Sequence, residues 1–427
     1  MVPDCNLVLK NVRIPNGRIA DISIAGGRVI HIGSGLPSDR VIDCFDYLCL
    51  PGGVDMHVHM RGGKEQSYKE TWETGTKSAI AGGVATVVDQ PNTIPPVLSR
   101  ETFAERLLEA KSQSLCNYGI NGGIFSGCDV KGMYESGALA FGEIFAAESS
   151  YGSAIGPDEL KKYFLKILNV GGLATVHAES VAKGNDNSLN DHSELRSETG
   201  EAAALKAVRD MAPLNLRLHF CHLSTPESVK FVSGIPNTTC EVMPHHLFLS
   251  IEMFDQMDGK GKVNPPLRHE GCRKDLWKMW DMIDVIASDH APHLLSEKTG
   301  DFSKVPSGMP GAETMIPLFI PHVFEKRINL NSLIEKTVIN PAKILGIPSA
   351  GYETGCRADF ALYPRRCERI QAEMLHSKAG WTPYEGMKAV FPEIMIINGE
   401  IVFNMGEFVK GSGQWIFGDG YIPYNSK

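Results

Sequence analysis

The chain has 427 residues, of which 43% are hydrophobic and 22% charged, the composition of an ordinary globular protein. Its formal net charge of -8 includes no basic tract, which argues against a nucleic-acid partner. The N-terminus has no signal-peptide pattern, and no apolar run is long enough to cross a membrane. We therefore expect a cytoplasmic protein with neither a nucleic-acid nor a membrane partner.

The two ends of the chain predict a small β domain. Short strands are expected at Leu7–Val12, Ile19–Ile24, Arg28–Ile32 and Arg40–Asp43, and again at Asp359–Tyr363, Ile394–Ile397 and Glu400–Phe403. Asn-Gly and Gly-Gly pairs, which favour hairpin turns, separate several of these strands. The simplest interpretation is that both ends pair into one sheet of a small β-sandwich domain, with residues 1–50 and 351–427 as its two parts.

Residues 51–350 alternate between strand and helix patterns, which predicts parallel βα units. Strands are expected at Asp55–Met60, Ala85–Asp89, Tyr118–Ile124, Leu139–Phe145, Leu173–His177, Leu216–His222, Thr239–Met243 and Asp284–Ser288. Helices are expected at Ser99–Ser112, Pro157–Asn169, Glu194–Met211 and Pro226–Val232. Eight parallel strands with helical returns close into a (β/α)8 barrel of the TIM type, whose active site lies at the carboxyl ends of the strands.

Polar side chains stand at six of the eight predicted strand ends. They are His57, His59 and Arg61 after the first strand, Asn92 after the second, His177 after the fifth, His222 after the sixth, the His245-His246 pair after the seventh and Asp289 after the eighth. His57 and His59 are two residues apart, so they share one face of a strand. Two neutral imidazoles that converge in this way form half of a divalent transition-metal site. The pattern therefore predicts a metal site at the rim of the barrel.

These residues have plainer alternatives. Two histidines on one strand can be surface residues, His177 can be held by a backbone carbonyl, and Asp289 can cap a helix. His219 and His222 are three residues apart and face opposite sides of a regular strand, so only one can bind a metal, and His222 lies nearer the rim. The recurrence of such residues at successive strand ends favours the metal site.

Glu143 lies inside an otherwise apolar predicted strand, LAFGEIF. Burying a glutamate there is costly unless a cation or strong hydrogen-bond donors meet it. On a regular strand Glu143 shares its face with Phe141 and Phe145. It therefore contacts either a metal ion or an inward-facing lysine or arginine.

The motifs around these residues resemble those of a known family. Nine segments follow one another along the chain: GGVDMHVHMR, TGTKSAIAGGVATVVDQPNT, VHAES, LHFCHLST, EVMPHHL, KVNPPLR, IASDHAPH, PSGMPGAET and NPAKILGI. Together they resemble the amidohydrolase superfamily and, more narrowly, the dihydroorotase family, over nearly the whole chain. The His-x-His pair marks the superfamily only, whereas PNT, NPPLR and DHAPH together are much more specific.

The resemblance implies a metal-dependent hydrolase with one or two divalent ions, usually Zn²⁺. Its small-molecule reaction would be the reversible cyclisation of N-carbamoyl-L-aspartate to (S)-dihydroorotate in pyrimidine biosynthesis. A homodimer is a further family-level expectation.

The same resemblance gives each site residue a role. The metal ligands would be His57 and His59 for the more buried ion, His177 and His222 for the second, and Asp289, which would also carry the proton. The substrate's free carboxylate would be bound by Arg61, Asn92 and His293. Asn264 and the backbone at Pro310 and Gly311 match residues that line the pyrimidine ring.

The fourth strand departs from the family pattern. Many relatives have a carboxylated lysine there that bridges two metals, whereas this strand contains Glu143 and no lysine. Glu143 could bridge the metals directly, or the site could hold one tightly bound ion and one weakly bound ion.

Two other functions remain open from the sequence. An allantoinase or hydantoinase on the same barrel would have the same metal ligands, because those ligands do not identify the ring. A catalytically silent relative that serves as a scaffold would be expected to lose some of the ligands, and all five of His57, His59, His177, His222 and Asp289 are present.

Overall fold

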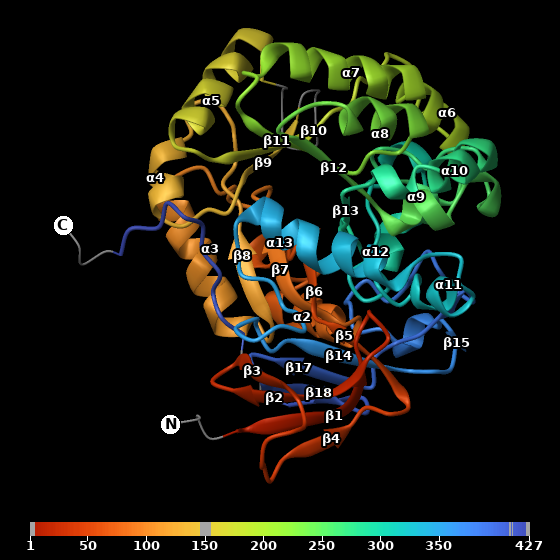
Figure 1. Cartoon of the computed structure of the whole chain (residues 1–427). Helices are drawn as coiled ribbons and strands as arrows, with labels where there is room; N and C mark the ends of the chain where they lie inside the picture. The colour runs from red at the N-terminus through yellow and green to blue at the C-terminus, as the bar shows by residue number, and fades with distance from the viewer. Residues whose placement is uncertain (1–4, 146–154, 410, 412, 424–427) are drawn as a thin grey trace.

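The computed structural model describes residues 5–145, 155–409, 411 and 413–423, and its body is a barrel of short parallel strands (Figure 1). The barrel strands are β6 (Gly53–Val58), β7 (Val84–Asp89), β8 (Asn117–Ile120), β9 (Phe141–Phe145), β10 (Leu173–His177), β11 (Arg217–Phe220), β12 (Thr238–Val242) and β13 (Val285–Ile286). They pair in chain order as one sheet of three strands and one of five. A bridge between Gly122 and Phe141 joins the two sheets on one side, and a bridge between Val58 and His290 joins them on the other. The predicted eight-stranded barrel is therefore confirmed.

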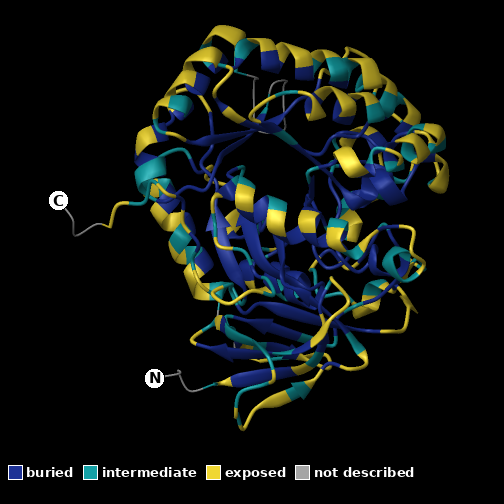
Figure 2. Cartoon of the chain, in the orientation of Figure 1, coloured by how far each residue is buried: buried dark blue, intermediate teal, exposed yellow. Residues whose placement is uncertain are grey.

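Helices surround these strands with their exposed faces outward and their buried faces against the barrel (Figure 2). They are α1 (Gly63–Gln66), α2 (Trp72–Ala81), α3 (Arg100–Gln113), α4 (Val130–Glu135), α5 (Pro157–Asn169), α6 (Leu189–Leu195), α7 (Glu198–Met211), α8 (Pro226–Ser233), α9 (Pro244–Phe248), α10 (Glu270–Trp277), α11 (Ile320–Phe324), α12 (Leu330–Ile334) and α13 (Asn340–Leu345). No helix in the described part of the chain is both long and apolar enough to span a bilayer.

The helix predicted from Glu194 to Met211 is interrupted. Ser197 adopts an extended backbone conformation and its side chain accepts a hydrogen bond from the backbone N–H of Gly200, so it caps α7 as a new helix. The preceding residues belong to the short helix α6. The sequence pattern missed this boundary because the apolar spacing continues across the cap.

Two sheets pack face to face beside the barrel. The first, in the order β3-β2-β1-β4, contains β1 (Leu7–Arg13), β2 (Ile19–Ala25), β3 (Arg28–Gly33) and β4 (Val41–Asp43). The second, in the order β19-β18-β17-β14-β5, contains β5 (Tyr47–Pro51), β14 (Phe360–Pro364), β17 (Ile394–Ile397), β18 (Glu400–Asn404) and β19 (Glu407–Phe408). A short ribbon of β15 (Glu368–Arg369) and β16 (Lys388–Ala389) lies apart from both sheets.

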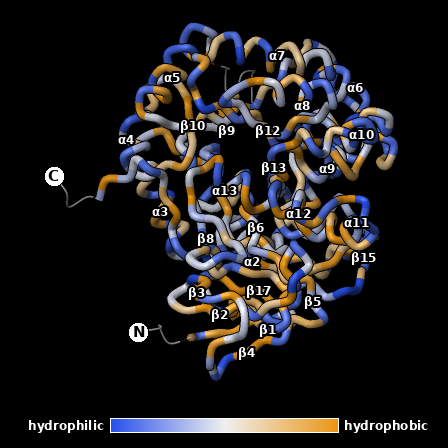
Figure 3. The backbone as a smooth tube through the Cα atoms, in the orientation of Figure 1, coloured by the Kyte–Doolittle hydropathy of each residue, from blue (hydrophilic) through white to orange (hydrophobic). Residues whose placement is uncertain are grey.

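These sheets confirm the β-sandwich built from both chain ends and correct its pairing. Residues such as Leu9 and Ile22 from one sheet share a buried core with Phe360 and Ile396 from the other, and the strands around it carry the hydrophobic colour in Figure 3. The ends do not form one sheet, because β1 to β4 pair among themselves and none of them pairs with β14, β17 or β18. Among the described strands before residue 52, β5 joins the second sheet by pairing with β14. The exact domain limits at residues 50 and 350 stay a prediction.

Candidate active site

A cavity of about 390 Å³ opens at the carboxyl ends of the barrel strands, and we call it the rim cavity. Eight of the residues singled out in the sequence line it: His59, Arg61, Asn92, Glu143, His177, Asn264, Asp289 and His293. His57 and His222 are buried, each 1% exposed, and they reach the same place through contacts with Glu143. The structure therefore brings together residues from strand ends far apart in the sequence.

Glu143, on β9, lies at the centre of the histidines. Its Oε1 lies 2.8 Å from Nδ1 of His177 and 2.6 Å from Nε2 of His222, and its Oε2 lies 3.8 Å from Nε2 of His57. Burial acts to raise the pKa of this carboxyl, but the hydrogen bonds from His177 and His222 outweigh burial and hold the pKa well below its usual value. The alternative of an inward-facing lysine or arginine is wrong, because the partners of Glu143 are imidazoles.

The backbone before Glu143 depends on a glycine. Gly142 has a φ of +135°, and a Cβ atom at this position would lie 2.1 Å from the carbonyl oxygen of Thr175 on the neighbouring strand β10. No larger residue fits there without moving a strand. The close approach of β9 to β10 therefore requires glycine next to the central carboxylate.

Asp289 forms a second group of polar atoms with the histidines of β6. Its Oδ1 lies 3.0 Å from Nε2 of His59 and 3.6 Å from Nε2 of His57. Burial raises the pKa of Asp289, whereas the hydrogen bond with His59 and the nearby imidazoles lower it, to about 2. Nε2 of His57 thus lies between two carboxylates, those of Glu143 and Asp289.

Three of these residues have left-handed backbone conformations. The φ angles of Arg61, His222 and Asp289 are 50°, 39° and 45°. A positive φ is uncommon for residues other than glycine, and such strained residues cluster at functional sites. His222 lies beyond the end of β11, so the strand alternation used to separate it from His219 does not extend to it.

Two further carboxylates contact the histidines, Glu241 from the buried side and Glu179 from the rim cavity, and neither was predicted from the sequence. Oε1 of Glu241, on β12, lies 2.5 Å from Nδ1 of His57, and Oε2 of Glu179 lies 3.1 Å from Nε2 of His177. Carboxylates in this position fix the ring orientation and tautomer of a metal-binding histidine. Glu241 could have been found by the criterion that identified Glu143, a glutamate inside an apolar strand.

The residues at the centre fit a divalent metal ion. Nε2 of His57 is buried and has no hydrogen-bond partner within the described residues, which is costly for a polar atom unless a ligand meets it. Three groups, all containing His57, have donor atoms within 4.8 Å of one another: His57, His59 and Asp289; His57, Glu143 and His222; and His57, Cys221 and Glu241. Imidazole nitrogens combined with carboxylate oxygens are ligands that zinc accepts.

Cationic and polar groups occupy another part of the rim cavity. Arg61 is 6% exposed, and no carboxylate of a described residue lies within ion-pair distance of it. Nζ of Lys69 lies 3.1 Å from Nδ1 of His293 and 2.9 Å from Oε1 of Glu297. Burial, together with the charges of Arg61 and Lys69, holds the pKa of His293 well below its usual value, so His293 is neutral. Lys69 gave no signal in the sequence, because it stands in a loop without a motif.

Asn92 and Asn264 also line the rim cavity, whereas Pro310 and Gly311 do not. Oδ1 of Asn92 lies 2.7 Å from Nδ1 of His59. Pro310 and Gly311 line a separate small cavity with His290, and the backbone N–H of Gly311 donates to Nδ1 of His290 at 3.1 Å. Their predicted contact with a ring substrate is therefore not visible in this geometry.

Comparison with known proteins agrees with the geometry. Residues 48–402 match the model of the Amidohydrolase family. The chain belongs to the amidohydrolase family. It is 41% identical to the dihydroorotase of Methanosarcina acetivorans, over 94% of this chain and 92% of that protein. It is 35% identical to the dihydroorotase of Halobacterium salinarum, over 93% of this chain and 96% of that protein.

Solved structures of the same architecture extend this similarity. The L-hydantoinase (dihydropyrimidinase) from Arthrobacter aurescens aligns with 97% of this chain and 100% of its own, with a TM-score of 0.90 at 25% identity. A D-hydantoinase from a Bacillus species, AR9, aligns with a TM-score of 0.85 at 23% identity, which shows the shared fold. As an amidohydrolase with dihydroorotase relatives, the chain is a metal-dependent hydrolase of cyclic amides.

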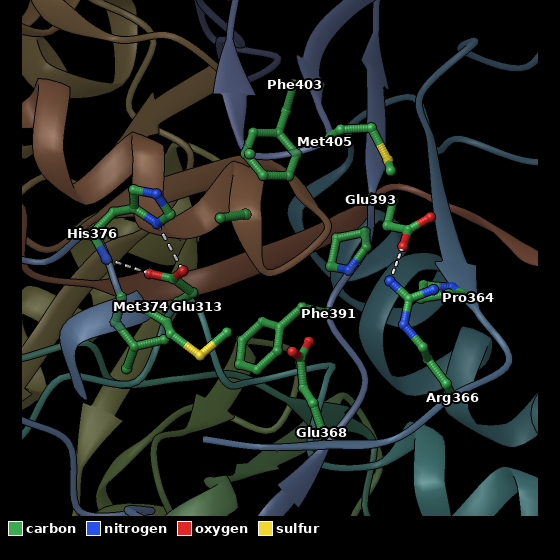
Figure 4. Close-up of a pocket in the computed structure, with 14 residues that line it drawn as sticks. Glu313, Pro364, Arg366, Glu368, Met374, His376, Phe391, Glu393, Phe403 and Met405 are labelled. Carbon is green, nitrogen blue, oxygen red and sulfur yellow. Dashed lines mark hydrogen bonds and ion pairs between the residues drawn. The ribbon is translucent and has the colours of Figure 1, made fainter. Parts of the chain in front are cut away.

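This amidohydrolase has a second cavity, of about 360 Å³, between the end of α2, the β14–β15 connection, the segment before β17 and the β18–β19 turn (Figure 4). Here the buried Glu313 and the half-buried Glu393 are paired with neighbours. Glu313 lies 2.8 Å from Nδ1 of His376, and Glu393 accepts hydrogen bonds from Arg366 and from Tyr47. None of the potential metal-binding groups found among the described residues includes a residue of this cavity.

Proposed function

We propose that the chain is a zinc-dependent dihydroorotase that interconverts N-carbamoyl-L-aspartate and (S)-dihydroorotate in the cytoplasm. The observation that carries this proposal is Arg61, a buried guanidinium in the rim cavity whose Nε has no hydrogen-bond partner among the described residues. A buried unpaired charge is costly, and a carboxylate matches a guanidinium in both charge and shape. Dihydroorotate carries such a carboxylate, whereas a neutral cyclic amide would leave the Arg61 guanidinium without a counter-ion.

The metal ligands are proposed from two of the three groups around His57, those that include Asp289 and Glu143. His57, His59 and Asp289 would hold one ion, His177 and His222 the other, with the Glu143 carboxylate between them. Bound zinc would polarise the ring carbonyl and lower the pKa of water toward ~7. Glu241 and Glu179 would keep the imidazole rings of His57 and His177 in position.

The substrate is oriented by the groups away from the metal ligands. Arg61 would hold the free carboxylate, with Asn92, His293 and the ammonium of Lys69 beside it in the same cavity. A fixed carboxylate places the ring carbonyl against the catalytic groups, and such positioning can account for several orders of magnitude in rate.

Asp289 is proposed as the proton carrier. Its carboxylate lines the rim cavity and is held by His59 at 3.0 Å. In hydrolysis Asp289 takes the proton of the attacking water and delivers it to the ring nitrogen as the C–N bond breaks. In synthesis it takes a proton from the ureido nitrogen as that nitrogen attacks the side-chain carboxyl carbon, and it gives this proton to the departing hydroxyl group, so that the C–O bond breaks and water leaves.

A substrate panel tests this function against an allantoinase or hydantoinase activity. We expect the zinc-loaded protein to turn over dihydroorotate and carbamoyl-aspartate, and to leave allantoin and unsubstituted hydantoin nearly unchanged. Turnover of allantoin or hydantoin without dihydroorotate would assign the barrel to that other reaction. A fully metal-loaded protein without activity on any of the four compounds would support the scaffold alternative.

A further inference from the structure

A buried histidine outside the metal groups, His192, contacts the side chain of Asn264. His192 belongs to α6 and is 1% exposed, whereas Asn264 lines the rim cavity. Nε2 of His192 lies 2.9 Å from Oδ1 of Asn264 and 3.0 Å from the backbone carbonyl oxygen of Val263. One ring nitrogen therefore faces a side-chain amide and a backbone carbonyl together.

The backbone carbonyl determines which way the amide points. A carbonyl oxygen can only accept a hydrogen bond, so Nε2 of His192 must carry a hydrogen and donate. If the amide of Asn264 were reversed, its NH₂ group would face this N–H, and two donors would oppose each other. The amide therefore presents its oxygen to His192 and turns its NH₂ group away from the ring.

The other side of the His192 ring is held by a carboxylate. The oxygens of Asp186 lie 3.0 and 3.1 Å from Nδ1, and Nζ of Lys262 lies 3.2 Å from Asp186. A carboxylate bonded to one ring nitrogen fixes the orientation of the imidazole and hence of the group on the other nitrogen. The contacts from Asp186 to His192 and from His192 to Asn264 thus fix the orientation of the Asn264 amide.

The NH₂ group of Asn264 has no partner among the residues that the structure describes. We propose that His192 is a positioning residue that fixes Asn264 as a hydrogen-bond donor to a carbonyl oxygen of the ring substrate, rather than as an acceptor from a ring N–H. This inference rests on the proposed function, because that function supplies the cyclic amide. A site with a fixed donor rejects a ligand that presents an N–H there, since two donors are then left unpaired.

A double-mutant cycle tests whether His192 acts through Asn264. The variants are His192→Leu, Asn264→Ala and the pair, each measured for kcat and KM of dihydroorotate hydrolysis together with metal content. We expect each single substitution to lower kcat/KM by about 10- to 100-fold, mainly through KM, as for a lost hydrogen bond to substrate. The pair should be no worse than Asn264→Ala alone, within about twofold, because both remove the same interaction.

His246 provides a matched control. It is also buried, and its Nε2 lies 3.0 Å from the backbone carbonyl of Pro265, so it supports the same loop without contacting the Asn264 amide. Any loss caused by His246→Leu should multiply with that of Asn264→Ala. If the losses in kcat/KM of His192→Leu and Asn264→Ala also multiply in the double variant, the proposal is overturned and His192 is a purely structural residue.

Two conservative variants guard against a folding defect. His192→Gln keeps a side-chain N–H donor for both acceptors and should recover most of the activity lost in His192→Leu. Asn264→Asp keeps an oxygen for His192 but removes the NH₂ donor, so it should fold normally and still raise KM by about tenfold or more. An Asn264→Asp protein with wild-type KM contradicts the inference.

The wild-type protein separates this inference from the proposed function. If it hydrolyses another cyclic amide of the panel in place of dihydroorotate, the proposed function fails, and the same cycle is measured with that compound. A non-additive cycle then still supports the role of His192, because every cyclic amide has a ring carbonyl.

Discussion

Two cavities of similar volume, about 390 and about 360 Å³, differ in the state of their polar side chains. In the rim cavity Arg61 has no ion-pair partner, and beneath it Nε2 of His57 is without a hydrogen bond within the described residues. In the second cavity Glu313 and Glu393 are paired with His376 and Arg366 (Figure 4). Volume does not separate a reaction site from a packing space here. The two kinds of cavity are separated by buried polar groups that lack a counter-ion or a hydrogen-bond partner. Burying such groups is costly unless a ligand supplies the missing partner.

The largest effect is expected where the proton is carried. Asp289→Asn keeps the size of the side chain and removes the base, so we expect a loss of kcat of about 10³-fold, within the range of general acid–base catalysis. Metal content measured on the same sample separates the loss of a proton carrier from the loss of a ligand. Substantial turnover by Asp289→Asn with unchanged metal content would disprove this role.

Removing the guanidinium of Arg61, which has no ion-pair partner among the described residues, should have the next largest effect on activity. Arg61→Met keeps much of the apolar stem and removes the guanidinium, so KM for dihydroorotate should rise about 100-fold, the effect of a lost charged hydrogen bond. Any slow turnover of hydantoin, which has no carboxylate, should change little. Equal losses for both compounds would mean that Arg61 does not recognise the carboxylate.

Substitution of Glu241 or Glu179, the carboxylates that contact the histidines, should have a smaller effect, which we expect on metal affinity. Glu241→Gln weakens the hold on Nδ1 of His57, and we expect metal affinity to fall about 10- to 100-fold. Competition with a chelator measures this affinity directly. Glu179→Gln is the matched variant at His177, and it should affect the second ion more than the first. Wild-type metal affinity in both variants would show that these carboxylates only fill space.

The smallest effect is expected in the second cavity. Glu368 is exposed there, and Met405 is 63% exposed on its wall. Glu368→Gln and Met405→Ala should leave kcat/KM for dihydroorotate within about twofold of wild type. A much larger loss in either variant would mean that the two cavities are coupled, and the comparison between them would no longer hold.

The sequence was sufficient for the barrel and for most of the residues that meet at its rim. Alternating strand and helix patterns determine the barrel, and its topology brings the ends of parallel strands to one rim, so His177 and Asp289 could be placed from their position after a strand. The predicted strand bounds were less accurate. The predicted strand Asp284–Ser288 is only Val285–Ile286 in β13, because backbone pairing ends where the chain turns toward the rim.

Features that depend on tertiary contacts could not be predicted. The left-handed backbone of His222 is not visible in a residue pattern, and neither is the contact of Lys69 with His293 across more than two hundred residues of chain. His192 stands in no motif that would single it out in the sequence. Its role emerges only because the fold places Asn264 next to it.

The most direct test of the account concerns the assembly of the metal site around Glu143. A carboxylated lysine forms only with carbon dioxide, whereas a glutamate supplies its carboxylate directly. Metal-depleted protein would be titrated with Zn²⁺ in buffer free of carbon dioxide, and bound metal and dihydroorotate hydrolysis followed in the same sample. The account predicts that activity rises with bound zinc to a plateau that added bicarbonate does not increase. Activity in the metal-free protein, or none at full metal occupancy until bicarbonate is added, would contradict it.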